Sequence, residues 1–95
     1  MREFTSKALV CELKKTSIKY TNQAIVKVQY DDIELGEQRV DLIIDGKVII
    51  ELKCVFELNK IHMAQMLSYL KTTSKKVGLI LNFAKSKLEI KRIVN

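Results

Sequence analysis

The sequence contains no proline, no tryptophan, one histidine and only two cysteines. Cys11 and Cys54 are too few for a disulfide framework. Together with His62 they lack the CxxC or HxxxH spacing of a zinc site. We therefore expect both cysteines to be buried free thiols. The absence of proline and a hydrophobic fraction of 47% favour a compact globule over a disordered tail.

Long apolar runs are also missing. No stretch approaches the roughly 20 residues of a membrane span, and Met1 leads directly into helical sequence rather than into a signal peptide. We therefore expect a cytoplasmic protein without a membrane partner.

The chain has 95 residues, which predicts a single domain over residues 1–95. A domain of this size has a modest core, so a homodimer is a plausible assembly.

The sequence has fewer acidic than basic residues. Lys and Arg number 17 against 11 Asp and Glu, giving a net charge of +6. An excess of this kind favours a polyanionic partner such as nucleic acid. Of the two nucleic acids, we expect DNA rather than RNA. The alternative is a lysine-rich surface that serves only solubility.

The stretch Arg39–Lys53 reads as two aliphatic strands joined at Asp45-Gly46 and interrupted by charges. Charges inside buried strands are costly unless they are paired or bind a metal. A two-residue loop would place Asp41 and Glu51 on opposite faces. A three-residue loop pairs Ile44 with Val48 and places both carboxylates and Lys53 on one face. We predict the three-residue loop, because it leaves an apolar opposite face made of Val40, Leu42, Ile44, Ile50 and Leu52.

Two carboxylates converging on one face form a hard-oxygen site suited to Mg²⁺ or Mn²⁺. We predict Asp41 and Glu51 as metal ligands, with the Leu52 carbonyl as a third. Lys53 lies two residues after Glu51 on the same face, where it can neutralise a phosphate or act on an activated water.

An Asp followed on the next strand by Glu-x-Lys resembles the signature of the PD-(D/E)xK nuclease superfamily. Val40 stands where the namesake motif has proline. The downstream segment NKIHMAQMLSYLKTTSKKVGLILNF resembles a block of the GxxExxY proteins, a branch of that superfamily. The likeness covers about Ala8 to Val94. Thr5 and Arg2 stand where that branch would carry the Tyr and Glu of its name, so we expect a natural short variant or a truncated chain.

The resemblance implies a restriction-endonuclease-like α/β fold with an αβββαβ core, in which two helices flank a small mixed sheet. It also implies that Gln65, on the second helix, hydrogen-bonds the water or the scissile phosphate. Glu12 has two interpretations. It completes the metal site, as a first-helix glutamate does in some superfamily members, or it is solvated and pairs with a nearby lysine.

The remaining pattern is consistent with this order of elements. Residues 4–15 read as a helix with Leu9 and Leu13 on one side. Residues 16–23 read as a loop, and residues 24–30 as a half-buried strand. Asn59 is the expected N-cap of a helix reaching residue 72. Residues 77–83 read as a buried strand parallel to the one that carries Glu51, and residues 88–93 as an edge strand.

Three functions remain open. The first is a metal-dependent nuclease that uses Asp41, Glu51, Lys53 and Gln65. The second is a non-catalytic module that binds nucleic acid or assembles with protein. In the third, the central charges form only an internal ion-pair cluster. Six lysines are candidates for contacts with a nucleic-acid backbone, namely Lys14, Lys15, Lys75, Lys76, Lys85 and Lys87.

Overall fold

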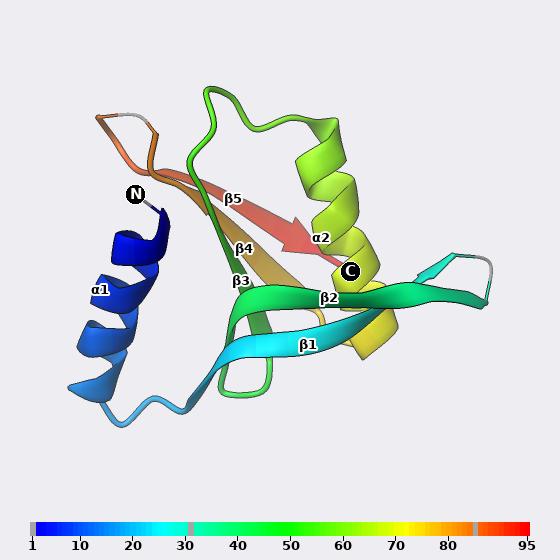
Figure 1. The fold of residues 1–95 in the computed structure, drawn as a ribbon, viewed down its shortest axis with the longest axis horizontal. Helices are drawn as coiled ribbons and strands as arrows, with labels where there is room; N and C mark the ends of the chain where they lie inside the picture. Colours follow the sequence, from blue (N-terminus) through cyan, green and yellow to red (C-terminus); the bar gives the residue numbers. More distant parts are fainter. Residues whose placement is uncertain (1, 31, 85) are drawn as a thin grey trace.

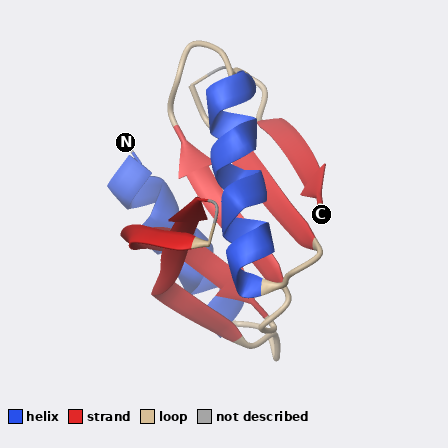
Figure 2. Ribbon diagram, turned by 90° about the vertical axis from the view of Figure 1, so that its right-hand side faces the viewer, coloured by secondary structure: helices blue, strands red, loops and turns tan. Residues whose placement is uncertain are grey.

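A mixed sheet of five strands lies between two helices in the computed structural model, which describes residues 2–30, 32–84 and 86–95 (Figures 1 and 2). The strand order is β1-β2-β3-β4-β5, and the predicted α/β fold is confirmed. The elements follow one another as α1 (Arg2–Lys14), β1 (Tyr20–Tyr30), β2 (Ile33–Ile44), β3 (Val48–Lys53), α2 (Lys60–Thr73), β4 (Val77–Asn82) and β5 (Glu89–Val94).

The hairpin between β2 and β3 has the predicted register. Ile44 pairs with Val48, which leaves a three-residue loop. Asp45 and Gly46 have positive φ angles of 53° and 65°, the conformation that suits Asp-Gly in a tight hairpin turn. The turn chemistry and the odd loop length therefore set which side chains share a face.

Helix α2 carries the chain from β3 to β4, and these two strands pair in parallel as expected. Asn59 caps the helix, since its side-chain oxygen accepts from the backbone N–H groups of Ile61 and His62. Met66 of α2 lies so close to Gly78 of β4 that a Cβ at position 78 would overlap its sulfur atom. A side chain at position 78 would therefore force the buried Met66 side chain to move.

Each helix covers its own apolar cluster. On the α2 side, the buried residues are Val26, Val40, Ile49, Met66, Tyr69, Leu70 and Ile80. On the α1 side, Leu9 and Leu13 pack as predicted against the buried residues Leu42, Ile50 and Leu52. The strands β2 and β3 contribute to both clusters, so their alternating side chains form the centre of the fold.

One prediction about this hairpin was wrong. Val40 was expected beside Leu42, yet it lies in the α2 cluster. The opposite strand explains the switch, because Gln23 has a positive φ of 56° between the pairs Asn22–Leu42 and Ala24–Val40. This irregularity breaks the alternation of faces, and the outer part of the β1–β2 hairpin turns towards α2.

Two further expectations need correction. β1 begins at Tyr20, four residues earlier than the pattern indicated, because Tyr20, Thr21 and Asn22 pair with the end of β2. The cysteines are free, as expected, but both are exposed rather than buried. Cys11 lies on the solvent side of α1, and Cys54 follows the last residue of β3.

Candidate active site

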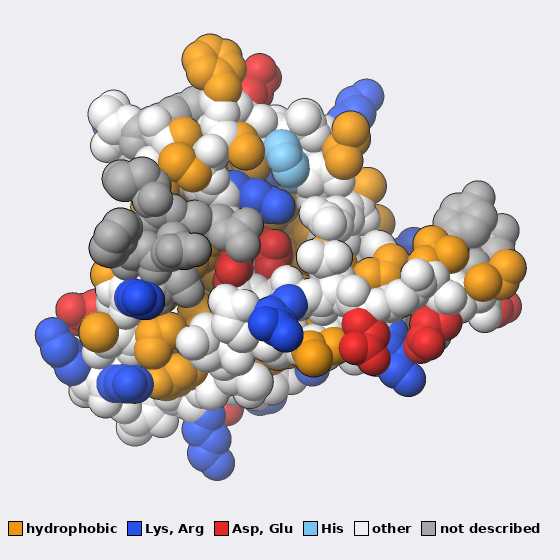
Figure 3. Space-filling model, in the orientation of Figure 1, with side chains coloured by type: hydrophobic (Ala, Val, Ile, Leu, Met, Phe, Trp, Pro, Cys, Tyr) orange, Lys and Arg blue, Asp and Glu red, His pale blue; other side chains and the backbone are white. Residues whose placement is uncertain are grey.

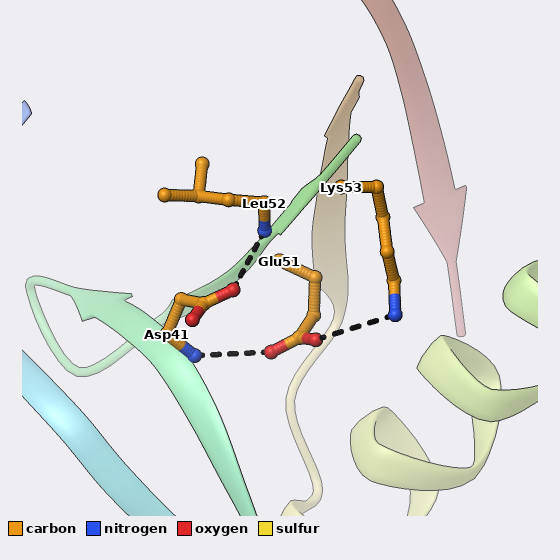
Figure 4. Close-up of polar contacts among 4 residues, drawn as sticks. All are labelled: Asp41, Glu51, Leu52 and Lys53. Atoms are coloured by element: carbon orange, nitrogen blue, oxygen red, sulfur yellow. Dashed lines mark hydrogen bonds and ion pairs between the residues drawn. The ribbon is translucent and has the colours of Figure 1, made fainter. Parts of the chain in front are cut away.

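The candidate site lies where β2 and β3 separate. Their main-chain ladder reaches Leu42 and Ile50, and the next position brings Asp41 opposite Glu51. At this position, hydrogen bonds to the two carboxylate side chains replace the main-chain hydrogen bonds between the strands. The Asp41 N–H donates to Glu51 Oε1 at 3.0 Å, and the Leu52 N–H donates to Asp41 Oδ2 at 2.8 Å (Figure 4). Each carboxylate therefore holds the backbone of the neighbouring strand.

Lys53 joins the two carboxylates on the same face. Its Nζ lies 4.0 Å from Glu51 Oε2, and the side chains of Lys53 and Glu51 are 19% and 10% exposed (Figure 4). Asp41 and Glu51 are both buried residues. Figure 3 shows acidic side chains in a hollow near the middle of one face of the molecule, with a basic side chain directly above them. The predicted grouping of Asp41, Glu51 and Lys53 is thus present in the structure.

The carbonyl of Leu52 points towards the same opening. In an extended strand the N–H and C=O of one residue point to the same side. Since the Leu52 N–H donates to Asp41, its carbonyl also faces β2. The Lys53 carbonyl faces the other way and accepts from the Phe83 N–H at 2.9 Å. The edge of β3 beyond Ile50 therefore offers one main-chain oxygen beside the two carboxylates.

Tyr69 of α2 is the next group close enough to the two carboxylates to feel their charge. It is only 2% exposed. Burial, followed by the negative charges of Glu51 and Asp41, raises the pKa of Tyr69 to about 12. The phenol is therefore neutral at physiological pH, and its environment includes both carboxylates.

This raised pKa predicts a loss of stability at high pH. The phenol ordinarily titrates at 10.0, so between pH 10 and about 12 the unfolded chain loses the Tyr69 proton while the folded chain retains it. The resulting difference lowers the free energy of unfolding by about 3 kcal/mol across this window. Chemical denaturation at several pH values should show a steeper decline for the natural protein than for Tyr69→Phe. Equal slopes for the two proteins would contradict the expectation.

Gln65 and His62 lie on the same helix but differ in position. Gln65 is exposed, one helical turn before Tyr69. His62 belongs to the start of the helix, because its Nδ1 accepts from the Asn59 N–H at 3.1 Å and completes a capping box. The structure thus assigns His62 a capping contact and leaves the role of Gln65 as a prediction.

Glu12 does not join the site. Its side chain on α1 is 71% exposed and forms an ion pair with Lys15 at 3.3 Å. Among the described residues, no group of three or more His, Cys, Asp or Glu side chains is arranged to hold a metal. The second interpretation of Glu12, a solvated partner of a lysine, therefore describes its position in the structure.

Residues 2–93 match the family described as the PD-(D/E)XK nuclease superfamily. The chain belongs to this superfamily. The charged residues at the fork between β2 and β3 are Asp41, Glu51 and Lys53, and their assignment as the motif residues of this superfamily stays a prediction. No curated protein matches the chain significantly.

Two solved structures share the superfamily fold seen here. One is the crystal structure of SSO0001, with a TM-score of 0.74 and 19% identity, covering 98% of this chain and 49% of that one. The other is an alkaline exonuclease from Laribacter hongkongensis, with a TM-score of 0.67 and 14% identity, covering 98% of this chain and 55% of that one. The present chain therefore spans about half the length of these two proteins.

Asn82 is a structural residue of this superfamily domain whose role the sequence did not reveal. It is fully buried at the end of β4. Its Oδ1 accepts from the N–H groups of Val55 and Ala84, and its Nδ2 donates to the Val55 carbonyl and to Glu89. Asparagine can satisfy both backbone groups of Val55 at once, so it holds the loop that follows Lys53.

Of the candidate lysines, Lys14 is the last residue of α1 and Lys15 follows it, while the others that the structure describes lie at two ends of the sheet. Lys75 and Lys76 precede β4, and Lys75 Nζ donates to the Gly46 carbonyl at 2.8 Å, which ties down the β2–β3 turn. Lys87 follows β4 at the opposite end. Lys85, and the side chains of Arg2 and Thr5, lie outside the described residues. None of the helices in the described part of the chain has the length and apolar character needed to span a membrane.

Proposed function

We propose that the protein is a metal-dependent nuclease that hydrolyses phosphodiester bonds, in DNA rather than RNA. The observation that carries the proposal is the fork between β2 and β3, where two buried carboxylates and Lys53 meet at an open strand edge. The net charge of +6 supports a polyanionic substrate.

The donor set fits a hard divalent cation. Carboxylate oxygens of Asp41 and Glu51 come from adjacent strands, and the Leu52 carbonyl faces the same side. Mg²⁺ is typically held by one or two carboxylates, with water and substrate phosphate completing its ligands, rather than by an all-protein cage. A site with two acidic ligands therefore suits Mg²⁺ or Mn²⁺, whereas soft metals would require sulfur or imidazole.

When bound, the cation would activate the attacking water and stabilise the charge that develops on the phosphate. The side chains of the protein would bind the phosphate and orient the water. Lys53 reduces the negative charge of the phosphoryl group and is kept near it by its own contact with Glu51. Gln65, exposed one turn before Tyr69, would hydrogen-bond the water or a phosphate oxygen. Tyr69 remains a neutral phenol beside the carboxylates.

Three finer assignments also remain predictions. The segment from Asn59 to Phe83 supports placing the protein in the GxxExxY branch of the superfamily. A homodimer is testable by light scattering coupled to gel filtration. A cytoplasmic location is testable by fractionation of the cells that produce the protein.

The test is cleavage of single-stranded DNA, double-stranded DNA and RNA with Mg²⁺ or Mn²⁺, beside a control that contains EDTA. We expect cleavage that requires the metal and is lost on chelation. Circular dichroism of the EDTA sample checks that the protein stays folded.

Absence of cleavage by the folded protein, across metals and substrates, would contradict the proposal. The binding module would then be the better account. Isothermal calorimetry with Mg²⁺ adds an independent measurement, because a module without chemistry has no need of a cation site at Asp41 and Glu51.

A further inference from the structure

The loop between β3 and α2 extends beyond the end of the sheet (Figure 1), and it carries the aromatic residue Phe56. Phe56 is 91% exposed, more than any other large hydrophobic residue among those described. Burying a phenylalanine is worth about 1.5–3 kcal/mol, and this position forgoes nearly all of that gain.

The exposure of Phe56 arises in a loop that is anchored on both sides of it. The N–H and C=O of Val55 are both bonded to the Asn82 side chain, at 3.0 and 2.9 Å. Leu58 packs against the α2 cluster, and Asn59 caps the helix. The neighbours of Phe56 are thus held by the protein while its ring is directed to solvent.

Phe56 is also close in sequence to the candidate site. It follows Lys53 by three residues, which span at most about 11 Å. A base that lies a few nucleotides from a phosphate bound at Lys53 could therefore reach Phe56. Phe83, 37% exposed, lies at the same end of the sheet, where its N–H donates to the Lys53 carbonyl. The exposed residues Lys60 and Lys87 flank these loops and add positive charge.

We propose that Phe56 is a stacking platform for an unpaired base, and that the site therefore acts on single-stranded nucleic acid or on a frayed end. The inference rests on the proposed function and specifies its substrate class. A phosphate would lie at Lys53 while a base a few nucleotides away stacks on the Phe56 ring. Aromatic stacking tolerates any base but requires that the base be unpaired, which excludes the interior of a duplex.

The absence of tryptophan from the chain makes the test direct. Phe56→Trp introduces the only tryptophan of the chain, and stacking with a base should quench its emission. The matched control is Ile25→Trp, at a position 58% exposed on the β1–β2 hairpin. Both variants are titrated in EDTA, which prevents metal-dependent cleavage, with a single-stranded oligonucleotide and with a blunt duplex. Anisotropy of the labelled oligonucleotide records binding independently.

We expect quenching of Phe56→Trp by the single strand, little by the duplex, and none in the Ile25→Trp control. Phe56→Ala should weaken binding of the single strand by about 5- to 150-fold, the range for loss of one stacked base, with less than about a twofold effect on the duplex. Cleavage of a single strand should fall in parallel at subsaturating substrate.

Several results would overturn the inference. One is binding by anisotropy without quenching of Phe56→Trp. If metal-dependent cleavage persists in that case, the proposed nuclease stands and only the role of Phe56 falls. Failure of both binding and cleavage would remove both proposals. A shift of the Phe56→Trp emission with protein concentration alone would assign the ring to a protein contact instead.

Discussion

Replacing Glu51 with glutamine is expected to lower the rate of metal-dependent cleavage by about 10²- to 10³-fold, or about 3–4 kcal/mol of activation free energy. The change removes one negative charge from the pair that would hold the cation. It retains an oxygen that can accept from the Asp41 N–H, the contact that Glu51 Oε1 makes at 3.0 Å. The variant should therefore fold while losing its chemistry, and single-turnover cleavage with saturating Mg²⁺ measures the effect.

The matched control is Glu37→Gln, which removes the same charge from an exposed position on β2. It should cleave at nearly the rate of the natural protein. If Glu51→Gln and Lys53→Ala both retained cleavage, the charges at the fork would be an internal ion-pair cluster rather than an active site. Replacing Asp41, Glu51 and Lys53 together by apolar residues would then leave function intact and could raise the melting temperature.

Replacing Asn82 with alanine is expected to lower the free energy of unfolding by about 2–4 kcal/mol. The substitution leaves the N–H and C=O of Val55 without their partner and removes the contacts to Ala84 and Glu89. A domain of this length has a total stability of only about 5–14 kcal/mol, so the loss is a large share. Urea denaturation followed by circular dichroism measures it.

Asn22→Ala is the control, since Asn22 is exposed on β1 and its loss should cost less than about 0.5 kcal/mol. Asn82→Ala should also reduce cleavage beyond its effect on stability, because Asn82 holds the loop that follows Lys53. A variant as stable as the natural protein would show that Val55 finds other partners, and the assigned role of Asn82 would be wrong.

Local chemistry accounts for the parts of the fold that the sequence predicted correctly. Asp45-Gly46 favours a tight turn with positive φ, and the hairpin register follows from it. Asn59 precedes a helical pattern and caps it. These features depend on residues close together in the chain, so the sequence contains the information needed to predict them.

The errors arose where distant segments meet. Tyr20 to Asn22 look like a loop until the end of β2 pairs with them. Val40 changes sides because Gln23, on the opposite strand, interrupts the alternation. The two cysteines are exposed because packing of the neighbouring elements, rather than residue type, decides burial.

The sequence by itself determined the order of the elements, the turn between β2 and β3, and the presence of Asp41, Glu51 and Lys53 on one face. Periodicity and turn chemistry are local, and they suffice for this. Only the tertiary structure decided that hydrogen bonds to the carboxylates replace the main-chain ladder where β2 and β3 separate. It also decided that Tyr69 is close enough to the carboxylates for their charge to raise its pKa, and that Glu12 lies outside the candidate site. It also decided that Asn82 holds the loop bearing Phe56. These outcomes depend on contacts between residues far apart in the chain, which no local pattern specifies.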